Sequence, residues 1–278
     1  MLLATLLALG AAVIHAGWNL IAKRAEGDRY MVLWAQFFCG GAVALPLMVG
    51  YQVIWGMPWQ GYVWAAISGC IHLPYCLLLA RAYTIGDFST SYPIARGGGA
   101  ALAAVGGVLL LGDHLSALEA TGIGIIVAGL CLLAYGVGRP ELLVALTLAA
   151  VIATYTITDA KGARVTESIA YIFATFAGAA ISNTTFGLIT GRRHDMAMML
   201  RANASRALFT GVASLVTYGM VLVAVRHAPV GYVTALRESS VVLAALAGWK
   251  MLGEGDHRRR ITAAVVVFSG LLVLISGG

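Results

Sequence analysis

Charged residues are scarce in this chain. Only 11% of its 278 residues are Asp, Glu, Lys or Arg, while 60% are hydrophobic; a typical soluble domain carries about 25% charged residues. So little polar cover excludes a soluble globular fold, because much of the apolar surface would face water. A lipid bilayer suits this composition, and it admits only helices or closed barrels, in which every backbone polar group is paired.

Cysteine is also rare and shows no ligand pattern. The four cysteines lie singly inside apolar stretches, which predicts small buried side chains and neither a metal nor a cofactor site. The net charge of +6 falls between apolar segments, so it indicates membrane topology rather than nucleic-acid binding. The sequence shows no Ser-His-Asp triad or carboxylate dyad that would favour an enzyme.

Long apolar runs are what the sequence has instead. They are continuous and close to the twenty residues that a membrane-spanning helix needs, without the alternation of barrel strands. The first run is expected to be a retained span, since no basic residue precedes it. We therefore predict an all-α integral membrane protein with ten transmembrane helices, at about 2–22, 31–50, 61–83, 88–111, 117–136, 140–159, 168–190, 205–225, 230–252 and 261–277.

An internal repeat divides the chain into residues 1–137 and 138–278. A shift of 141 residues places Arg96 on Arg237 and the turn Leu111-Gly112-Asp113 on Leu252-Gly253-Glu254. Each predicted half has five spans, and an odd number makes the second half enter the membrane from the opposite side. Inverted five-helix repeats are typical of secondary transporters, because two pseudo-symmetric states can expose one central site alternately.

The distribution of basic residues predicts the orientation. Loops after the odd-numbered spans carry 13 Lys and Arg residues, and the opposite side carries three, Lys161, Arg164 and Arg226. Because cytoplasmic loops are enriched in Lys and Arg, we expect both termini outside the cytoplasm. The predicted location is the cell membrane, the inner membrane in a bacterium.

Three charged residues lie within predicted spans. A charge at the bilayer centre costs at least about 2.5–3.5 kcal/mol, so it usually serves a purpose inside the bundle. One interpretation is that Arg96 and Arg237 converge on an anionic substrate, with Glu238 nearby. The alternative is a structural ion pair between helices, such as Arg96 with Glu238.

Other polar side chains are candidates for the same site. His15, Trp18 and Asn19 share one helix face, and they either line a cavity or form interhelical hydrogen bonds. Glu238, His15 and Asp159 are the candidate proton carriers. The remaining candidates for substrate contact come from other spans, where aromatic residues also serve packing or the membrane interface: His72, Tyr75, Tyr92, Tyr155 and Tyr232.

The paired Leu-Gly-acid turns closing spans four and nine resemble the EamA branch of the drug/metabolite transporter superfamily. The run His15-Ala16-Gly17-Trp18-Asn19 followed by Lys23 resembles one subgroup of it. The resemblance implies a central cavity lined by spans 1, 3, 4, 6, 8 and 9, with substrate meeting basic residues on spans four and nine. The chain departs from many members in having no basic residue between spans two and three, and relatives are commonly drawn with cytoplasmic termini.

Together these features predict a secondary active transporter for a small anionic or zwitterionic metabolite, such as an amino-acid-like compound or an organophosphonate. The expected partners are this substrate, the lipid bilayer, and protons or a counter-substrate, with the chain acting as a monomer or homodimer. The alternatives are a membrane-embedded enzyme, a lipid-handling protein, and a scaffold that transports nothing. No catalytic residue is expected.

Overall fold

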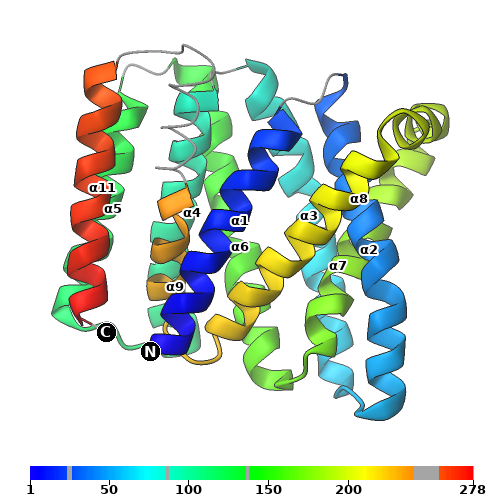
Figure 1. Ribbon diagram of the computed structural model, residues 1–278, viewed down its shortest axis with the longest axis horizontal. Helices are drawn as coiled ribbons and strands as arrows, with labels where there is room; N and C mark the ends of the chain where they lie inside the picture. Colours follow the sequence, from blue (N-terminus) through cyan, green and yellow to red (C-terminus); the bar gives the residue numbers. More distant parts are fainter. Residues whose placement is uncertain (24–26, 86–87, 136–137, 241–256, 278) are drawn as a thin grey trace.

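The computed structural model describes residues 1–23, 27–85, 88–135, 138–240 and 257–277, and it is helical throughout (Figure 1). The long apolar runs form helices, because a helix pairs the backbone polar groups of its own segment where no water is present. The helices are α1 (Leu2–Lys23), α2 (Arg29–Ile54), α3 (Trp59–Ile85), α4 (Phe88–Leu111), α5 (Ala117–Ala134), α6 (Arg139–Thr166), α7 (Ala170–Ile189), α8 (Arg193–Ala224), α9 (Val230–Arg237) and α11 (His257–Gly277).

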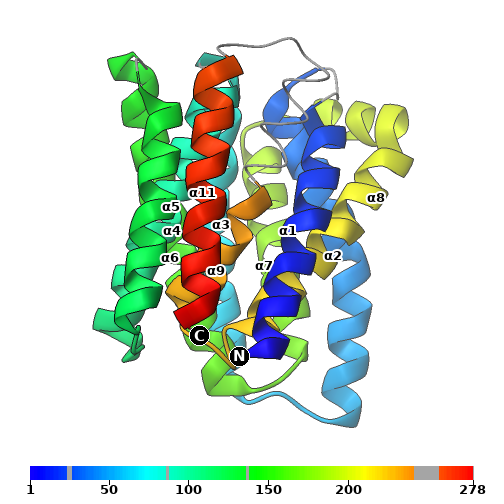
Figure 2. The same ribbon diagram turned by 60° about the vertical axis from the view of Figure 1, so that its left-hand side comes forward.

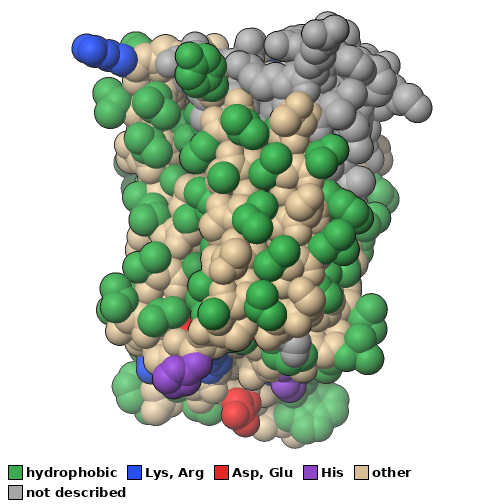
Figure 3. Space-filling view, turned by 90° about the vertical axis from the view of Figure 1, so that its left-hand side faces the viewer, with side chains coloured by type: hydrophobic (Ala, Val, Ile, Leu, Met, Phe, Trp, Pro, Cys, Tyr) green, Lys and Arg blue, Asp and Glu red, His purple; other side chains and the backbone are tan. Residues whose placement is uncertain are grey.

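Six of these helices are long and apolar enough to cross a membrane, and three shorter stretches are also apolar. The face that lies at the left of Figure 1 carries hydrophobic side chains over its middle, while charged and histidine side chains gather near its ends (Figure 3). This distribution is what a bilayer-spanning bundle requires, since its middle contacts lipid tails. The chain is therefore a multi-pass membrane protein.

Most predicted spans coincide with a helix to within a few residues, and α4 has the predicted bounds. The sixth span was predicted too short: α6 continues to Thr166. Lys161 and Arg164, assigned to a loop, therefore belong to the end of this helix, where Arg164 donates to backbone oxygens of the α8–α9 connection. Of the ninth predicted span, 230–252, the structure describes residues 230–240, which contain α9. Residues 241–252 lie outside the described residues.

The prediction of a long link over 191–204 was wrong, because α8 already begins at Arg193. Its first part is polar enough to suggest a loop, but Met196 is buried and fits against Gly187 of α7. The helix bends at Asn203, where φ is −135°. An amphipathic segment at the bundle's end thus precedes the spanning part, and it lies at an angle to that part in Figure 1.

Most helix pairs of the described structure correspond when the two predicted halves are exchanged. The equivalent helices pack on each other in the pairs α2–α7, α4–α9 and α5–α11. Three further pairs of the described structure have counterparts: α4–α6 with α9–α1, α3–α7 with α8–α2, and α3–α6 with α8–α1. The α4–α5 pair has only a slight counterpart in α9–α11 within the described residues. Both termini lie at one end of the bundle (Figures 1 and 2). At that end Ser116 Oγ donates to the carbonyl oxygen of Gly277 at 3.2 Å, so α5 and α11 run antiparallel.

Glycine allows α2 and α8 to approach closely beside the bundle centre. A Cβ atom on Gly211 would lie 2.6 Å from the backbone oxygen of Gln36 and 2.7 Å from the nitrogen of Gly40. Any side chain at position 211 would therefore push the two helices apart, as expected for small residues at membrane helix contacts. The close approach holds Gln36 next to the polar residues of α8.

Candidate functional site

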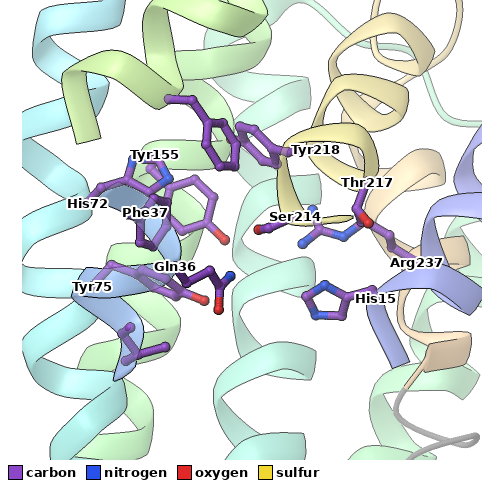
Figure 4. Close-up of a pocket in the computed structure, with 12 residues that line it drawn as sticks. His15, Gln36, Phe37, His72, Tyr75, Tyr155, Ser214, Thr217, Tyr218 and Arg237 are labelled. Carbon is purple, nitrogen blue, oxygen red and sulfur yellow. The ribbon is translucent and has the colours of Figure 1, made fainter. Parts of the chain in front are cut away.

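A cavity lies at the centre of the bundle, between α1, α2, α3, α6, α7, α8 and α9 (Figure 4). Its empty volume is about 470 Å³, including the open space at its mouth. The cavity differs from the expected one in that α2 and α7 also line it, whereas none of its lining residues comes from α4.

Arg237 provides the positive charge of this cavity. It is the last residue of α9, and its side chain is 4% exposed. Figure 4 shows its guanidinium directed into the cavity, close to Ser214 and on the same side as His15. Within the described part of the chain, its Nε atom has no hydrogen-bond partner and its guanidinium takes part in no ion pair.

Arg96 and Glu238 form the interhelical pair that the sequence left open as an alternative. Arg96 Nη2 lies 2.8 Å from Glu238 Oε1, and the two side chains are 4% and 2% exposed. This pair joins α4 to the end of α9, and neither residue lines the cavity. Glu238 Oε2 is buried without a hydrogen-bond partner in the described structure. The structure thus separates the two repeat-related arginines, with Arg96 in the ion pair and Arg237 at the cavity.

His15 lies on the arginine side of the cavity. It is buried on α1, and both Arg96 and Arg237 are close enough to act on it electrostatically. Its ring faces the cavity in Figure 4. Thr217 and Ser214, from α8, add hydroxyl groups to this side. The Thr217 hydroxyl donates to the carbonyl oxygen of Ala213 at 2.7 Å, so its remaining capacity is as an acceptor.

Aromatic rings form the opposite wall. His72 lies with its ring centroid 4.7 Å from that of Tyr155, and Tyr75 lies 5.4 Å from Tyr155. Tyr218, from α8, completes the wall, with its ring centroid 6.1 Å from that of His72. The ring centroids of Phe37 and His72 lie 5.6 Å apart. Such a wall can stack on a planar or apolar part of a ligand, and its electron-rich faces can also hold a cation.

Gln36 lies between the two sides of the cavity in Figure 4. It is buried on α2, and its Oε1 atom has no hydrogen-bond partner in the described structure. A buried amide without a partner is costly unless a ligand or water completes it. Sequence reasoning missed Gln36, although it is the one uncharged amide in the middle of the second span and could have been found there.

Tyr218 and Phe176 were also missed. Tyr218 lies four residues after Ser214 and so shares its helix face, but the Ser and Thr residues of α8 were treated as packing residues. Phe176 comes from α7, where its apolar side chain does not differ from a residue that packs in the core. Only the arrangement of the helices distinguishes these two residues from their neighbours.

Some predicted site residues lie elsewhere. Tyr232 is fully buried on α9, and its hydroxyl is 2.8 Å from Thr5 Oγ1, so it joins α9 to α1 outside the cavity lining. The side chains of Trp18, Asn19 and Tyr92 lie outside those that the structure describes. In the described ranges, no three His, Cys, Asp or Glu side chains gather closely enough to hold a metal ion.

The chain is thus a multi-pass membrane protein with a cavity between its helices, which polar and aromatic side chains line. Residues 139–276 match the model of the EamA-like transporter family. This match places the chain in that family, which is part of the drug/metabolite transporter superfamily. Members of this family are membrane transporters, and the recognition made from the sequence is confirmed.

A solved crystal structure of another protein is similar over 98% of both chains, with a TM-score of 0.72 and 19% sequence identity. At this identity the similarity shows a shared fold. No curated protein matches the chain significantly.

Proposed function

We propose that the protein is a secondary active transporter for a small metabolite that carries a carboxylate, phosphonate or phosphate group. The anionic group binds Arg237, and the rest of the molecule lies against the aromatic wall. Amino-acid-like compounds and organophosphonates have this combination of groups. We further propose that the protein acts by alternating access and catalyses no reaction.

The observation that carries this proposal is that Arg237 lines the cavity without an ion-pair partner in the described structure. A guanidinium inside the membrane is costly without an anion, and in the described part of the chain it has none, although Arg96 nearby has Glu238. Its planar fork of N–H donors matches the two oxygens of a carboxylate or phosphonate. The substrate's anion is the group that would complete it.

The rest of the cavity suits a zwitterion. Gln36 and Ser214 can form hydrogen bonds with polar groups, while the rings of Tyr155 and His72 face Arg237 across the cavity. An amino group could lie against these rings, since aromatic faces attract cations.

Alternating access is supported by the packing of the two halves. Most helix pairs of the described structure correspond when the two halves are exchanged. The last helices of the two halves, α5 and α11, run antiparallel. Those features are expected of ten spans arranged as two inverted repeats, 1–137 and 138–278. In such an arrangement, a second conformation with the opposite opening has the same kinds of helix contacts.

The test is a thermal-shift screen of the purified protein with amino acids, phosphonates and phosphorylated metabolites, each beside an uncharged analogue. A ligand that binds the folded state raises the apparent melting temperature. We expect anionic members alone to stabilise the protein. Arg237→Lys should weaken their binding roughly tenfold to a hundredfold, as for loss of a charge-assisted hydrogen bond of about 1.5–3 kcal/mol.

Arg201→Lys is the matched control, because Arg201 is exposed at the end of the bundle. It should leave both ligand binding and transport into vesicles unchanged. Unaltered ligand stabilisation in Arg237→Lys, or equal stabilisation by the uncharged analogues, would rule out an anion site at Arg237.

A further inference from the structure

A carboxylate lies buried behind the aromatic wall of the cavity. Asp159 is 0% exposed and lies one helical turn after Tyr155 on α6. No lysine or arginine in the described ranges forms an ion pair with it, whereas Asp113 and Glu238 each bind an arginine. Asp159 is not part of the cavity lining.

Two tyrosine hydroxyls hold the carboxylate. Tyr171, from α7, donates to Asp159 Oδ1 at 3.0 Å, and Tyr218, from α8, donates to Oδ2. Tyr218 also lines the cavity. One side chain, that of Tyr218, therefore contacts both the buried carboxylate and the cavity in which the ligand is proposed to bind.

The helices packed against α6 bring few other titratable groups to Asp159. From α3, His72 acts on the carboxylate electrostatically, and Ser68 lies beside it. His72 Nδ1 donates to the backbone oxygen of Ser68 at 2.8 Å, so in the neutral ring Nε2 is the basic atom. From α4, the charged residue is Arg96, which is engaged with Glu238. The tyrosines complete the set from α7 and α8.

Proton binding would change the hydrogen bonding of Tyr218. A carboxylate without a cation inside a membrane is unfavourable, and a proton removes its charge. The ionised group accepts the hydroxyl hydrogen of Tyr218. After Oδ2 takes up a proton, its new O–H donates to the Tyr218 oxygen, and the hydroxyl hydrogen of Tyr218 becomes available to the cavity. The proton comes from the aqueous phase and no electrons move.

We propose that Asp159 is a proton-binding site that couples proton uptake to ligand binding in the cavity. This inference rests on the proposed transport function and adds its coupling ion. A proton on Asp159 makes Tyr218 a hydrogen-bond donor to the part of the ligand that lies against the aromatic wall, while Arg237 holds the anionic group. Loss of the proton returns that donor to Asp159 and weakens the hold on the ligand.

Infrared spectroscopy of the full chain in lipid vesicles tests the site directly, with the proton as the probe. A protonated carboxyl group has a C=O stretch that a carboxylate lacks and that shifts in D₂O. We expect a band of this kind that grows as the pH is lowered and is absent in Asp159→Asn. The matched control is Asp195→Asn, an exposed acid, which should retain the band. A wild-type spectrum without a titrating band that Asp159→Asn removes would overturn the proposal.

Tyr218→Phe gives a second readout that does not depend on the folding of the Asn variant. It leaves the carboxyl group and removes one hydrogen-bond partner, so the band should persist at a higher frequency. An unchanged frequency would contradict the link through Tyr218. Exchange of choline chloride for sodium chloride should not alter the melting temperature; a sodium-dependent rise that Asp159→Asn removes would mean a sodium site instead.

Arg237→Lys separates the two proposals. It should lose anion-dependent stabilisation and keep the titrating band. Absence of the band with ligand stabilisation intact would refute the proton site alone. Presence of the band without any Arg237-dependent ligand stabilisation would refute the proposed anion site alone.

Discussion

Arg96 and Arg237 occupy corresponding positions in the sequence repeat, but their surroundings differ. Arg96 is bound to Glu238 at 2.8 Å, and Arg237 lines the cavity without an ion-pair partner in the described structure. The two arginines therefore make different contacts, although their positions in the repeat correspond. The pair holds α4 to the end of α9, which places Arg237, the neighbour of Glu238, at the cavity wall.

The pair makes a quantitative prediction. Removal of one partner leaves a buried charge uncompensated, which costs about 3–5 kcal/mol, whereas removal of both is often close to neutral. We expect Arg96→Gln and Glu238→Gln each to lower the free energy of unfolding strongly, and the double variant to recover most of that loss. Unfolding in mixed detergent, analysed as a double-mutant cycle, measures the coupling. Losses that simply add would show that the two side chains do not depend on each other.

At the scale of the helices, the turn between α4 and α5 ties three elements together. Gly112, with φ of +71°, allows the turn, and Asp113 Oδ2 accepts from the backbone nitrogen of Val230 at 2.7 Å. Asp113 Oδ1 accepts from Arg164 Nη1 at 2.6 Å. Arg164 in turn donates to the backbone oxygen of Val225 at 2.7 Å. The start of α9, the end of α6 and this turn therefore form one polar cluster.

Asp113→Asn tests this cluster. The amide oxygen can still accept from Val230, but the charge that binds Arg164 is lost, so we expect a destabilisation of about 1–3 kcal/mol. Asp195→Asn is the matched control, because Asp195 forms an exposed pair with Arg192 at 3.4 Å and such pairs contribute about 0–1 kcal/mol. The melting temperatures of the two variants decide the matter. Equal small shifts would mean that the cluster contributes no more than a surface pair.

At the scale of the whole molecule, orientation in the membrane is the property to test. The charge distribution predicts that the end carrying both termini faces away from the cytoplasm. His114 and His194 are exposed and lie at opposite ends of the bundle, next to the α4–α5 turn and at the start of α8. Each can be replaced by cysteine in a chain whose four native cysteines are serine.

In intact cells, a membrane-impermeant thiol reagent should label His114→Cys and not His194→Cys. Permeabilised cells should show labelling of both, which controls for the reactivity of each cysteine. Labelling of His194→Cys alone in intact cells would place the termini in the cytoplasm, as in the common drawing of the relatives.

Much of the helical fold could be predicted, because the signals behind it are local. Apolar runs near twenty residues correspond to α1–α5, α7 and α11. The helix ends at α6 and α8 were misplaced for a local reason as well. Polar residues near 160–166 and 193–203 resemble loops in composition, yet their helices continue into the interfacial region, where water and lipid headgroups accept such side chains.

The cavity could be predicted only in part. Arg237, His15, His72, Tyr75 and Tyr155 are polar or ambiguous side chains within apolar spans, and the cost of placing such groups in lipid identified them. The same rule would have identified Gln36. It could not identify Phe37 and Phe176, since their side chains suit lipid and core equally.

The sequence by itself determined that this protein is a helical membrane transporter of the EamA-like family with two arginines in equivalent spans. The helical membrane class needs only composition and apolar run length, and the pairing of the two arginines needs only internal similarity. The family rests on the resemblance of the Leu-Gly-acid turns and the His15-Ala16-Gly17-Trp18-Asn19 run, and on the match over residues 139–276. The tertiary structure decided that Arg96 binds Glu238 while Arg237 faces the cavity, that α2 and α7 also line it, and that Tyr218 joins Asp159 to it. The physical reason lies in the solvent: lipid tails are as apolar as a protein core, so hydrophobicity does not distinguish a helix face that meets lipid from one that meets another helix.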